Sequence, residues 1–285
     1  MGAVREISEV LKSVPTIEGA GVHLKRAFGN KEMNRLDPFL LLDDFHSDNP
    51  EDYINGFPWH PHRGIETITY ILNGKVEHGD SIGNMGIISS GDVQWMTAGS
   101  GIIHQEMPVG EQDGLLWGFQ LWANLPSSHK MMEPRYRDIK SGDIPVVETE
   151  NSARIKIICG EVNNIIGPAR DIVINPEFLD VTVPPETDFI HSITMGHTVF
   201  AYIISGNGYF HNRHENMNGP ETLVIFDDGD EIAAISGREG VRFLLVSGKP
   251  IGEPIAWYGP IVMNTQEELL KAFEEYEQGT FLKHK

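Results

Sequence analysis

The sequence has one cysteine, Cys159, so no disulfide can form within the 285-residue chain. Cytosolic proteins seldom contain disulfides, whereas small secreted domains often depend on them. Cys159 ends the alternating segment 155–159, which predicts a packed strand residue rather than a redox thiol. Residues 1–9 carry mixed charge and no apolar run, so a secretory signal is not expected. We therefore predict a cytoplasmic protein.

Long apolar runs and clusters of basic residues are also missing. The longest apolar runs, such as residues 39–42 and 199–204, are far shorter than the roughly 20 residues that span a bilayer. The 41 acidic residues outnumber the 22 basic ones, which gives a formal net charge of -19. Such a surface repels phosphate backbones. The sequence therefore predicts neither a membrane protein nor direct binding of nucleic acid.

Helical periodicity is scarce, and most of the chain consists of short β-branched segments separated by glycine turns. Asn73-Gly74, Gly91-Asp92 and Asp228-Gly229-Asp230 are turns of this kind. Closely spaced short strands with turn signals are typical of β-sandwiches and β-barrels rather than of a doubly wound sheet. We predict an all-β protein.

One helix is expected near the C-terminus, over residues 266–278. Thr265 and Glu268 have the spacing of a capping box, and Gly279 is a natural C-terminal stop. Four residues at helical spacing form the predicted apolar face: Leu269, Leu270, Phe273 and Tyr276. This pattern indicates a packing element rather than a chemical site.

The chain also repeats itself weakly. Residues 198–206, TVFAYIISG, resemble residues 66–74, ETITYILNG, and Gly229-Asp230 resembles Gly91-Asp92. Two similar β-domains in tandem are the simplest interpretation. The segment between them contains three prolines, so we place the boundary there and predict domains at 1–137 and 138–285.

The chemistry is concentrated in two pairs of polar residues in the first repeat. His60 and His62 share a face of an extended segment because successive side chains alternate sides. His104 and Glu106 form a second pair with the same spacing. Three imidazole nitrogens and one carboxylate oxygen suit a first-row transition metal. A barrel that faces both pairs inward would bring them into one metal pocket.

The residues alone leave the fourth ligand open. His60, His62, Glu66, Ile68 and Tyr70 share a face of the extended segment, so Glu66 competes with Glu106. The aromatic residues near these pairs are candidates for a substrate wall, with core packing as the simpler expectation: Phe57, Trp59 and Trp95. Arg63 and Gln105 flank the ligands, and we expect outward-facing structural roles for both, with the orientation of a substrate or a nearby carboxylate as the alternative for Arg63.

The second repeat lacks these ligands. Matching Gly206 to Gly74 and Gly229 to Gly91 gives the residues equivalent to His60, His62, His104 and Glu106, which are Ser192, Thr194, Arg242 and Leu244. His191 and His197 occupy only neighbouring positions. The sequence therefore predicts metal binding in the first domain alone.

The stretch from Gly56 to Met107, GFPWHPHRGIETITYILNGKVEHGDSIGNMG…GDVQWMTAGSGIIHQEM, resembles the pirin family, a bicupin group. PFLLLDDF near residue 38 and GPIVMNTQEEL near the C-terminus extend the resemblance over nearly the whole chain. It implies a cupin double-stranded β-helix (jelly roll) in each half. It also implies Fe(II) in the N-terminal half, with His60, His62, His104 and Glu106 as ligands, which favours Glu106 over Glu66. Ligand type is also compatible with manganese, nickel, copper or zinc.

The resemblance further implies an activity like that of quercetin 2,3-dioxygenases, which open the central ring of a flavonol with O2. Glu106 would be the catalytic base for the flavonol 3-hydroxyl, and another enol-bearing metabolite is an alternative substrate. The family also implies a second kind of function, in which a monomeric pirin-like protein acts as a transcriptional co-regulator or modulates a protein partner, with the metal as a redox switch.

Overall fold

The computed structural model describes residues 2–211 and 216–284. The regular structure of these residues is mostly β-strand, as predicted, with one α-helix near the C-terminus. The chain forms two compact units. Unit 1 contains residues 1–14, 35–38 and 142–250, and unit 2 contains residues 15–34, 39–141 and 251–285.

The ends of the chain are exchanged between the units. The N-terminal strand β1 (Ile7–Lys12) pairs with β20 (Thr222–Phe226) in unit 1, whereas residues 251–285 belong to unit 2. The units change near residue 141, close to the predicted boundary. The contiguous domains 1–137 and 138–285 do not anticipate this exchange, because any strand within reach can pair with an open sheet edge, whatever its position in the sequence.

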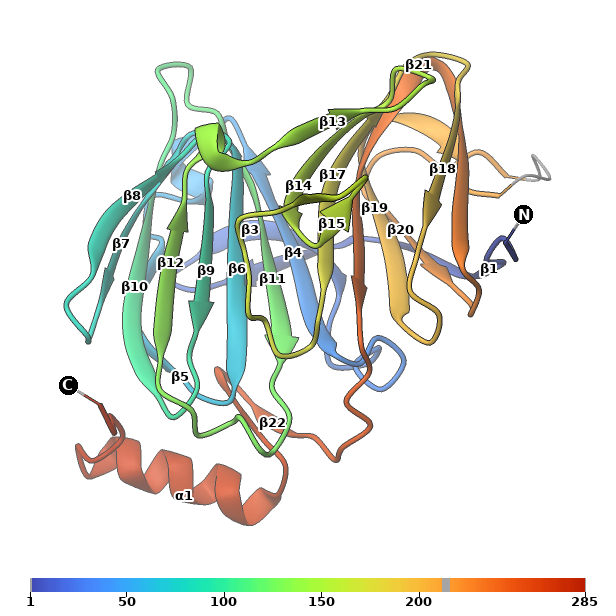
Figure 1. Ribbon diagram of the computed structural model, residues 1–285. Helices are drawn as coiled ribbons and strands as arrows, with labels where there is room; N and C mark the ends of the chain where they lie inside the picture. The colour runs from blue at the N-terminus through green and yellow to red at the C-terminus, as the bar shows by residue number, and fades with distance from the viewer. Residues whose placement is uncertain (1, 212–215, 285) are drawn as a thin grey trace. The chain divides into compact units, whose positions relative to one another are not determined.

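Unit 2 contains two antiparallel sheets (Figure 1). The larger sheet has seven strands, in the spatial order β12 (Arg135–Ile139), β9 (Val93–Thr97), β6 (Ile65–Asn73), β11 (Leu116–Asn124), β4 (Phe39–Ser47), β3 (Val22–Phe28) and β2 (Val14–Glu18). The smaller sheet has four, in the order β5 (Phe57–His62), β10 (Ile102–Val109), β7 (Lys75–Asp80) and β8 (Met85–Ser89). A 3-10 turn, Pro50–Asp52, precedes β5, and another, Ser141–Asp143, follows β12.

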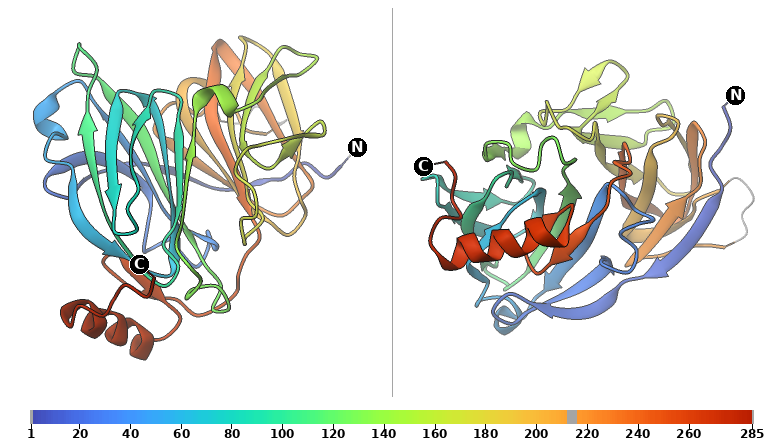
Figure 2. Two further views of the ribbon diagram at one scale, coloured as in Figure 1. Left: turned by 60° about the vertical axis from the view of Figure 1, so that its left-hand side comes forward. Right: turned by 90° about the horizontal axis from the view of Figure 1, so that it is seen from below.

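The C-terminal segment of unit 2 forms the short hairpin β22 (Ala256–Tyr258) and β23 (Ile261–Met263), followed by α1 (Gln266–Glu277). Figures 1 and 2 show α1 lying at one end of the strands of unit 2. Thr265 caps α1 through both bonds of the predicted capping box. The predicted apolar face is partly wrong: Leu269 and Ala272 are buried, but Leu270 is 63% exposed.

Unit 1 contains one large antiparallel sheet and a small hairpin. The order in the sheet is β1, β20, β19 (Thr198–Tyr209), β21 (Glu231–Gly248), β17 (Glu177–Val183), β14 (Arg154–Cys159) and β13 (Val146–Glu148), and β18 (Asp188–Ser192) pairs with β21. The hairpin consists of β15 (Glu161–Val162) and β16 (Ile165–Ile166). Cys159 is buried and its thiol donates to the carbonyl of Ala169, which agrees with a packed strand residue.

The strand pairing corrects the predicted equivalence of the repeats. In unit 2, β10 pairs with β5, and β11 pairs with β6 and β4. In unit 1, the first part of β21 pairs with β18, whereas its second part, residues 241–248, pairs with β19 and β17. Arg242 and Leu244 therefore lie on the counterpart of β11 rather than of β10. The counterpart of β10 is the segment around Ala233, which the prediction missed because β21 runs through both positions without a break.

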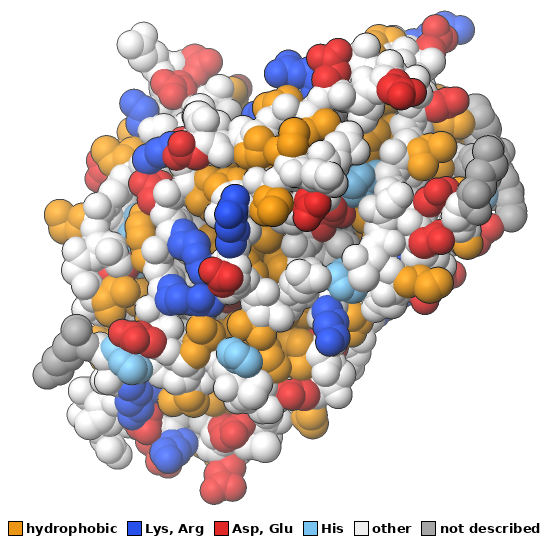
Figure 3. Space-filling model, in the orientation of Figure 1, with side chains coloured by type: hydrophobic (Ala, Val, Ile, Leu, Met, Phe, Trp, Pro, Cys, Tyr) orange, Lys and Arg blue, Asp and Glu red, His pale blue; other side chains and the backbone are white. Residues whose placement is uncertain are grey.

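Charge is distributed unevenly over the surface. Figure 3 shows Lys and Arg side chains gathered over β12, which carries Arg135 and Arg137. Lys140, just beyond this strand, forms ion pairs with Asp138 and Asp92 at 2.8 and 3.2 Å. Part of this small basic group is therefore neutralised locally. No helix among the described residues is long and apolar enough to cross a membrane.

Candidate metal centre and substrate cavity

Three histidines of unit 2 meet where β5 pairs with β10. His104 lies directly opposite His60 in this antiparallel pair, and His62 is two residues further along β5. One ring nitrogen from each of the three histidines lies within 4.8 Å of the others, and this is the one metal-ligating group of its kind among the described residues. The structure thus brings together three of the four predicted ligands.

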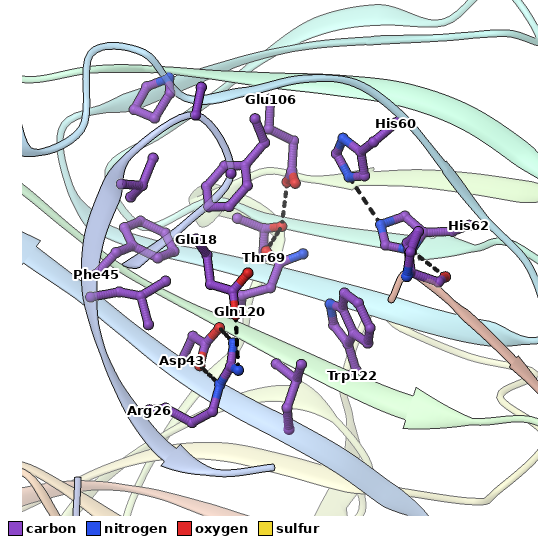
Figure 4. Close-up of a pocket in the computed structure, with 18 of the residues that line it drawn as sticks. Glu18, Arg26, Asp43, Phe45, His60, His62, Thr69, Glu106, Gln120 and Trp122 are labelled. Atoms are coloured by element: carbon purple, nitrogen blue, oxygen red, sulfur yellow. Dashed lines mark hydrogen bonds and ion pairs between the residues drawn. The ribbon is translucent and has the colours of Figure 1, made fainter. Parts of the chain in front are cut away.

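The hydrogen bonds of His60 and His62 to backbone carbonyls involve Nδ1 on both rings and leave Nε2 available as a metal ligand. Nδ1 of His60 lies 2.9 Å from the carbonyl of Pro58, and Nδ1 of His62 lies 3.0 Å from that of Pro260. A carbonyl only accepts, so we assign the proton to Nδ1 on both rings. The two Nε2 atoms are 3.0 Å apart (Figure 4), so two lone pairs face each other. A shared cation would resolve this repulsion.

His104 is fully buried, and neither of its ring nitrogens has a hydrogen-bond partner. Buried polar atoms are nearly always satisfied, so this exception calls for a missing partner. Burial, followed by the nearby histidines, lowers the pKa of His104 well below its ordinary value, and burial also lowers the pKa values of His62 and His60. The three rings are therefore neutral at pH 7, as metal coordination requires. These residues fit a transition-metal ion.

Glu106, the fourth predicted ligand, lines the same cavity but lies outside the three-histidine group. Its Oε1 is 3.0 Å from the hydroxyl of Thr69 on β6, and Oε1 of Gln120 is 2.7 Å from that hydroxyl. Thr69 has one proton and cannot donate to both oxygens. We assign this proton to the bond with Glu106 and turn the Gln120 amide, so that its NH2 group donates to the Thr69 oxygen.

Glu66 does not compete for this position, and the predicted parity is wrong. Glu66 accepts from Thr97 at 2.6 Å and does not line the cavity, whereas Thr69 does. The reason is a turn at Gly64, where φ is +79°, between β5 and β6. The two strands belong to different sheets, so the alternation of β5 does not continue into β6.

His60, His62 and Glu106 line a cavity of about 590 Å³, within the usual range of about 300–1,000 Å³ for small-molecule sites. Most of its wall is apolar. Phe57 lines it, as the sequence suggested, but Trp59 is 53% exposed and Trp95 is buried elsewhere. The aromatic pair Trp122 and Trp257 also lines the cavity, with ring centroids 6.0 Å apart, and no sequence pattern pointed to it.

The C-terminal segment holds the metal-ligating segment in place through hydrogen bonds. Besides the Pro260 carbonyl on His62, it supplies the partners of Arg63, which is 2% exposed. The guanidinium of Arg63 donates to Glu275 at 2.8 Å and to the carbonyl of Phe281 at 2.7 Å. Arg63 is buried rather than outward-facing, which corrects the prediction, although its contacts are structural; Gln105 is absent from the cavity wall. Only the HPHRG order linked Arg63 to the site in the sequence.

Unit 1 has no comparable group among the described residues. His191 is 3.0 Å from a carboxylate oxygen of Glu177, and His197 borders a separate surface pocket with Ser192 and Thr194. The interior of this unit is filled by an apolar cluster that includes Phe189, Ile232, Ala234 and Phe243.

Comparison with known proteins gives the same picture for both units. Residues 21–123 match the family model described as Pirin, and residues 178–282 match the Pirin C-terminal cupin domain. A "Pirin-like protein" from Caulobacter vibrioides is 39% identical over 280 residues, which cover 98% of this chain and 99% of that protein. The expected fold class, two cupin domains in tandem, is confirmed.

Solved structures agree with this assignment. A quercetin 2,3-dioxygenase from Acinetobacter baumannii is 32% identical, with a TM-score of 0.89 over 98% of this chain and 99% of that one. A bacterial pirin from Escherichia coli in complex with nickel(II) shares the fold at 21% identity, with a TM-score of 0.64 over 85% and 98% of the two chains. The two family-model matches and the 39% identity to a pirin-like protein over nearly the whole chain show that the chain belongs to the pirin family.

Proposed function

We propose that this protein is an iron-dependent dioxygenase of the quercetin 2,3-dioxygenase type, which opens the central ring of a flavonol, or of a related enol, with O2. The proposed ligands of Fe(II) are His60, His62, His104 and Glu106. The observation that carries the proposal is a group of three neutral imidazoles, two of which, His60 and His62, line an apolar cavity large enough for a flavonol. The similarity to a quercetin 2,3-dioxygenase over almost the full chain supports it.

The residues of the cavity suggest how a flavonol is held. The aromatic and aliphatic wall, which includes Phe57, Trp122 and Trp257, would cover the faces of a flat ligand and exclude water. His60 and His62 are held in their orientations through Nδ1 by two backbone carbonyls, so their Nε2 atoms stay directed at the shared position. A bound metal ion supplies a Lewis acid and a template for the enol oxygen and O2.

Glu106 is the proposed catalytic base. Its carboxylate would accept the proton of the flavonol 3-hydroxyl, because it lies in the cavity wall beside the histidines. Thr69 donates to Oε1 and thereby fixes one oxygen while the other stays available. Gln120 completes the support from the neighbouring strand β11.

Anaerobic reconstitution with Fe(II), followed by quercetin and O2, tests the proposal. We expect loss of quercetin with release of carbon monoxide. His104→Ala should abolish both iron binding and turnover, whereas Glu106→Gln should abolish turnover. His23→Ala and Glu77→Gln, two exposed changes of the same chemical type, are the matched controls and should behave as the parent protein.

Full iron occupancy without turnover would contradict the oxygenase and favour the alternative function, a pirin-like regulator that responds to the redox state of its metal and modulates a protein partner. Parallel loading with Fe(II) and nickel(II) tests the identity of the metal, since the histidine group suits both ions. The cytoplasmic location and the monomeric state stay predictions, which fractionation and light scattering would test.

A further inference from the structure

A row of polar side chains crosses the floor of the cavity. The strand register places Arg26 of β3 opposite Asp43 of β4, Asp43 opposite Gln120 of β11, and Gln120 opposite Thr69 of β6. All four residues line the cavity, so they lie on the same face of the sheet. Side chains directly opposite each other across strands are close neighbours. The row therefore runs from Arg26 to the Thr69 that contacts Glu106.

The outer part of the row is a paired charge group. Nε and Nη2 of Arg26 donate to the two oxygens of Asp43 at 2.8 and 2.7 Å, and Nη1 is 3.0 Å from a carboxylate oxygen of Glu18. The Asp43 side chain is only 7% exposed. Figure 4 shows this group well separated from His60 and His62, with Gln120 and Thr69 between them.

Apolar side chains border the row on both sides. The neighbouring row pairs Leu41 with Trp122, and the next residue along β4 on the cavity face in the other direction is Phe45. An apolar wall alone would let a flat aromatic ligand rotate within its own plane. A few polar groups at a fixed place in such a wall select one orientation.

Stability does not account for this ion pair, in which Asp43 is buried and Arg26 is half-buried, since apolar residues of similar size often hold a fold together equally well. The pair also keeps unused capacity. Each oxygen of Asp43 has a further lone pair, and a guanidinium has five N–H groups, of which the contacts with Asp43 and Glu18 use three. Phenolic hydroxyls, which both donate and accept, match such a surface.

We propose that the row formed by Arg26, Asp43 and Gln120 is a recognition subsite for phenolic hydroxyls on the part of a flavonol that does not reach the metal centre. This inference rests on the proposed function, and it names the substrate class as polyhydroxylated flavonols. Flavonols without hydroxyls on their other rings would leave the charged pair facing an apolar surface, which is unfavourable.

The test is a comparison of two ligands without turnover. Quercetin and 3-hydroxyflavone share the 3-hydroxyl and the neighbouring ketone, but only quercetin has hydroxyls on the outer rings. In the iron-loaded protein under anaerobic conditions, we expect quercetin to bind about 10-fold more tightly or better, as hydrogen bonds to charged groups would give. Fluorescence titration of each ligand gives the ratio.

The informative variant is Arg26→Leu/Asp43→Leu, which removes both charges together. We expect it to bind 3-hydroxyflavone as the parent does, with the quercetin preference lost. The matched control is Arg242→Leu/Asp180→Leu in unit 1, which removes a pair of the same bidentate geometry, at 2.9 and 2.7 Å. The control should keep the preference. Gln120→Leu leaves the ion pair intact and should reduce the preference, so the subsite stays testable even if the double variant does not fold.

The subsite and the proposed function fail in different ways. An unchanged quercetin preference in a folded, iron-loaded double variant or in Gln120→Leu would overturn the subsite, even if the enzyme turns quercetin over. A preference that depends on these residues without any turnover would support the subsite and overturn the oxygenase. Equal binding of both flavonols by the parent protein, or binding of neither, would also overturn the subsite.

Discussion

The two β-units of this protein have strands paired in a similar order, but the interior of unit 1 is an apolar cluster and that of unit 2 contains a cavity with polar side chains in its wall. In unit 1 the inward side chains form one apolar cluster, to which β21 contributes Ile232, Ala234 and Phe243. In unit 2 the pairing of β5 with β10 places His104 opposite His60, and His60, His62 and Glu106 line a cavity. The backbone pairing in both units is antiparallel and similar in order, so it does not select between a packed core and a ligand site.

The two units differ in the side chains at their inward-facing positions and in the interactions that stabilise those side chains. The apolar interior of unit 1 is satisfied by packing alone. The ring nitrogens of the unit 2 histidines need partners: Pro58 provides one for His60 and the distant Pro260 provides one for His62, whereas neither nitrogen of His104 has a partner in the protein. A metal centre in this fold therefore requires both the inward-facing ligands and the segments that hydrogen-bond to them.

The largest expected effect concerns packing. Phe243→Ala in unit 1 should lower the free energy of unfolding by about 3–5 kcal/mol, because it leaves a void in a filled interior. Phe57→Ala, in the cavity wall of unit 2, should cost less because this ring already borders open space. Denaturant unfolding, with hydrogen exchange to separate the units, measures both. Equal losses would contradict the contrast between a filled and a hollow interior.

The metal should distinguish the units next. His104→Ala should weaken iron binding by more than about 100-fold, since it removes a ligand rather than an outer partner, whose loss alone costs about 10- to 100-fold. His191→Ala changes a buried histidine of unit 1 that pairs with Glu177, and should leave iron binding unchanged. Metal analysis of both purified variants checks this. Retained stoichiometric iron in His104→Ala would refute the ligand assignment.

The C-terminal support should have an intermediate effect. Arg63→Met removes three hydrogen bonds that join the ligand strand to Ser100, Glu275 and Phe281. We expect a loss of about 2–3 kcal/mol in unit 2 and about 10-fold weaker iron binding. Arg35→Ala breaks an exposed ion pair with Glu9 in unit 1 and should cost less than about 1 kcal/mol. Unaltered iron affinity in Arg63→Met would show that the support is structural only.

The smallest effect is a pH dependence of the metal-free protein. The pKa of His104 is lowered in the folded state, so below the unfolded value of about 6.5 the unfolded chain binds more protons. Stability from this group is therefore present above pH 6.5 and is lost as the pH falls, by up to about 1.4 kcal/mol per unit. His104→Leu should flatten this decline between pH 7 and 5.5. An identical slope in parent and variant would exclude a neutral, buried His104.

Local rules made the strands, the helix and the ligand pairs predictable. The capping box at Thr265 fixed the start of α1 because it depends on residues three positions apart. The alternation within β10 predicted that His104 and Glu106 share a face; both are buried, and Glu106 lines the cavity. The same rule failed between His62 and Glu66, where the turn at Gly64 resets the parity and moves the chain to another sheet.

An all-β repeat with one set of metal-ligating pairs follows from the order of residues alone, because these features depend on residue type and near spacing. The side chains that surround those pairs follow from the folded chain. Thr69 rather than Glu66 faces Glu106, Trp122 and Trp257 form a wall, and Pro260 orients His62 from 198 residues away. The physical reason is that strand pairing and the exchange of chain ends between units join distant segments, and no local pattern in the sequence records such contacts.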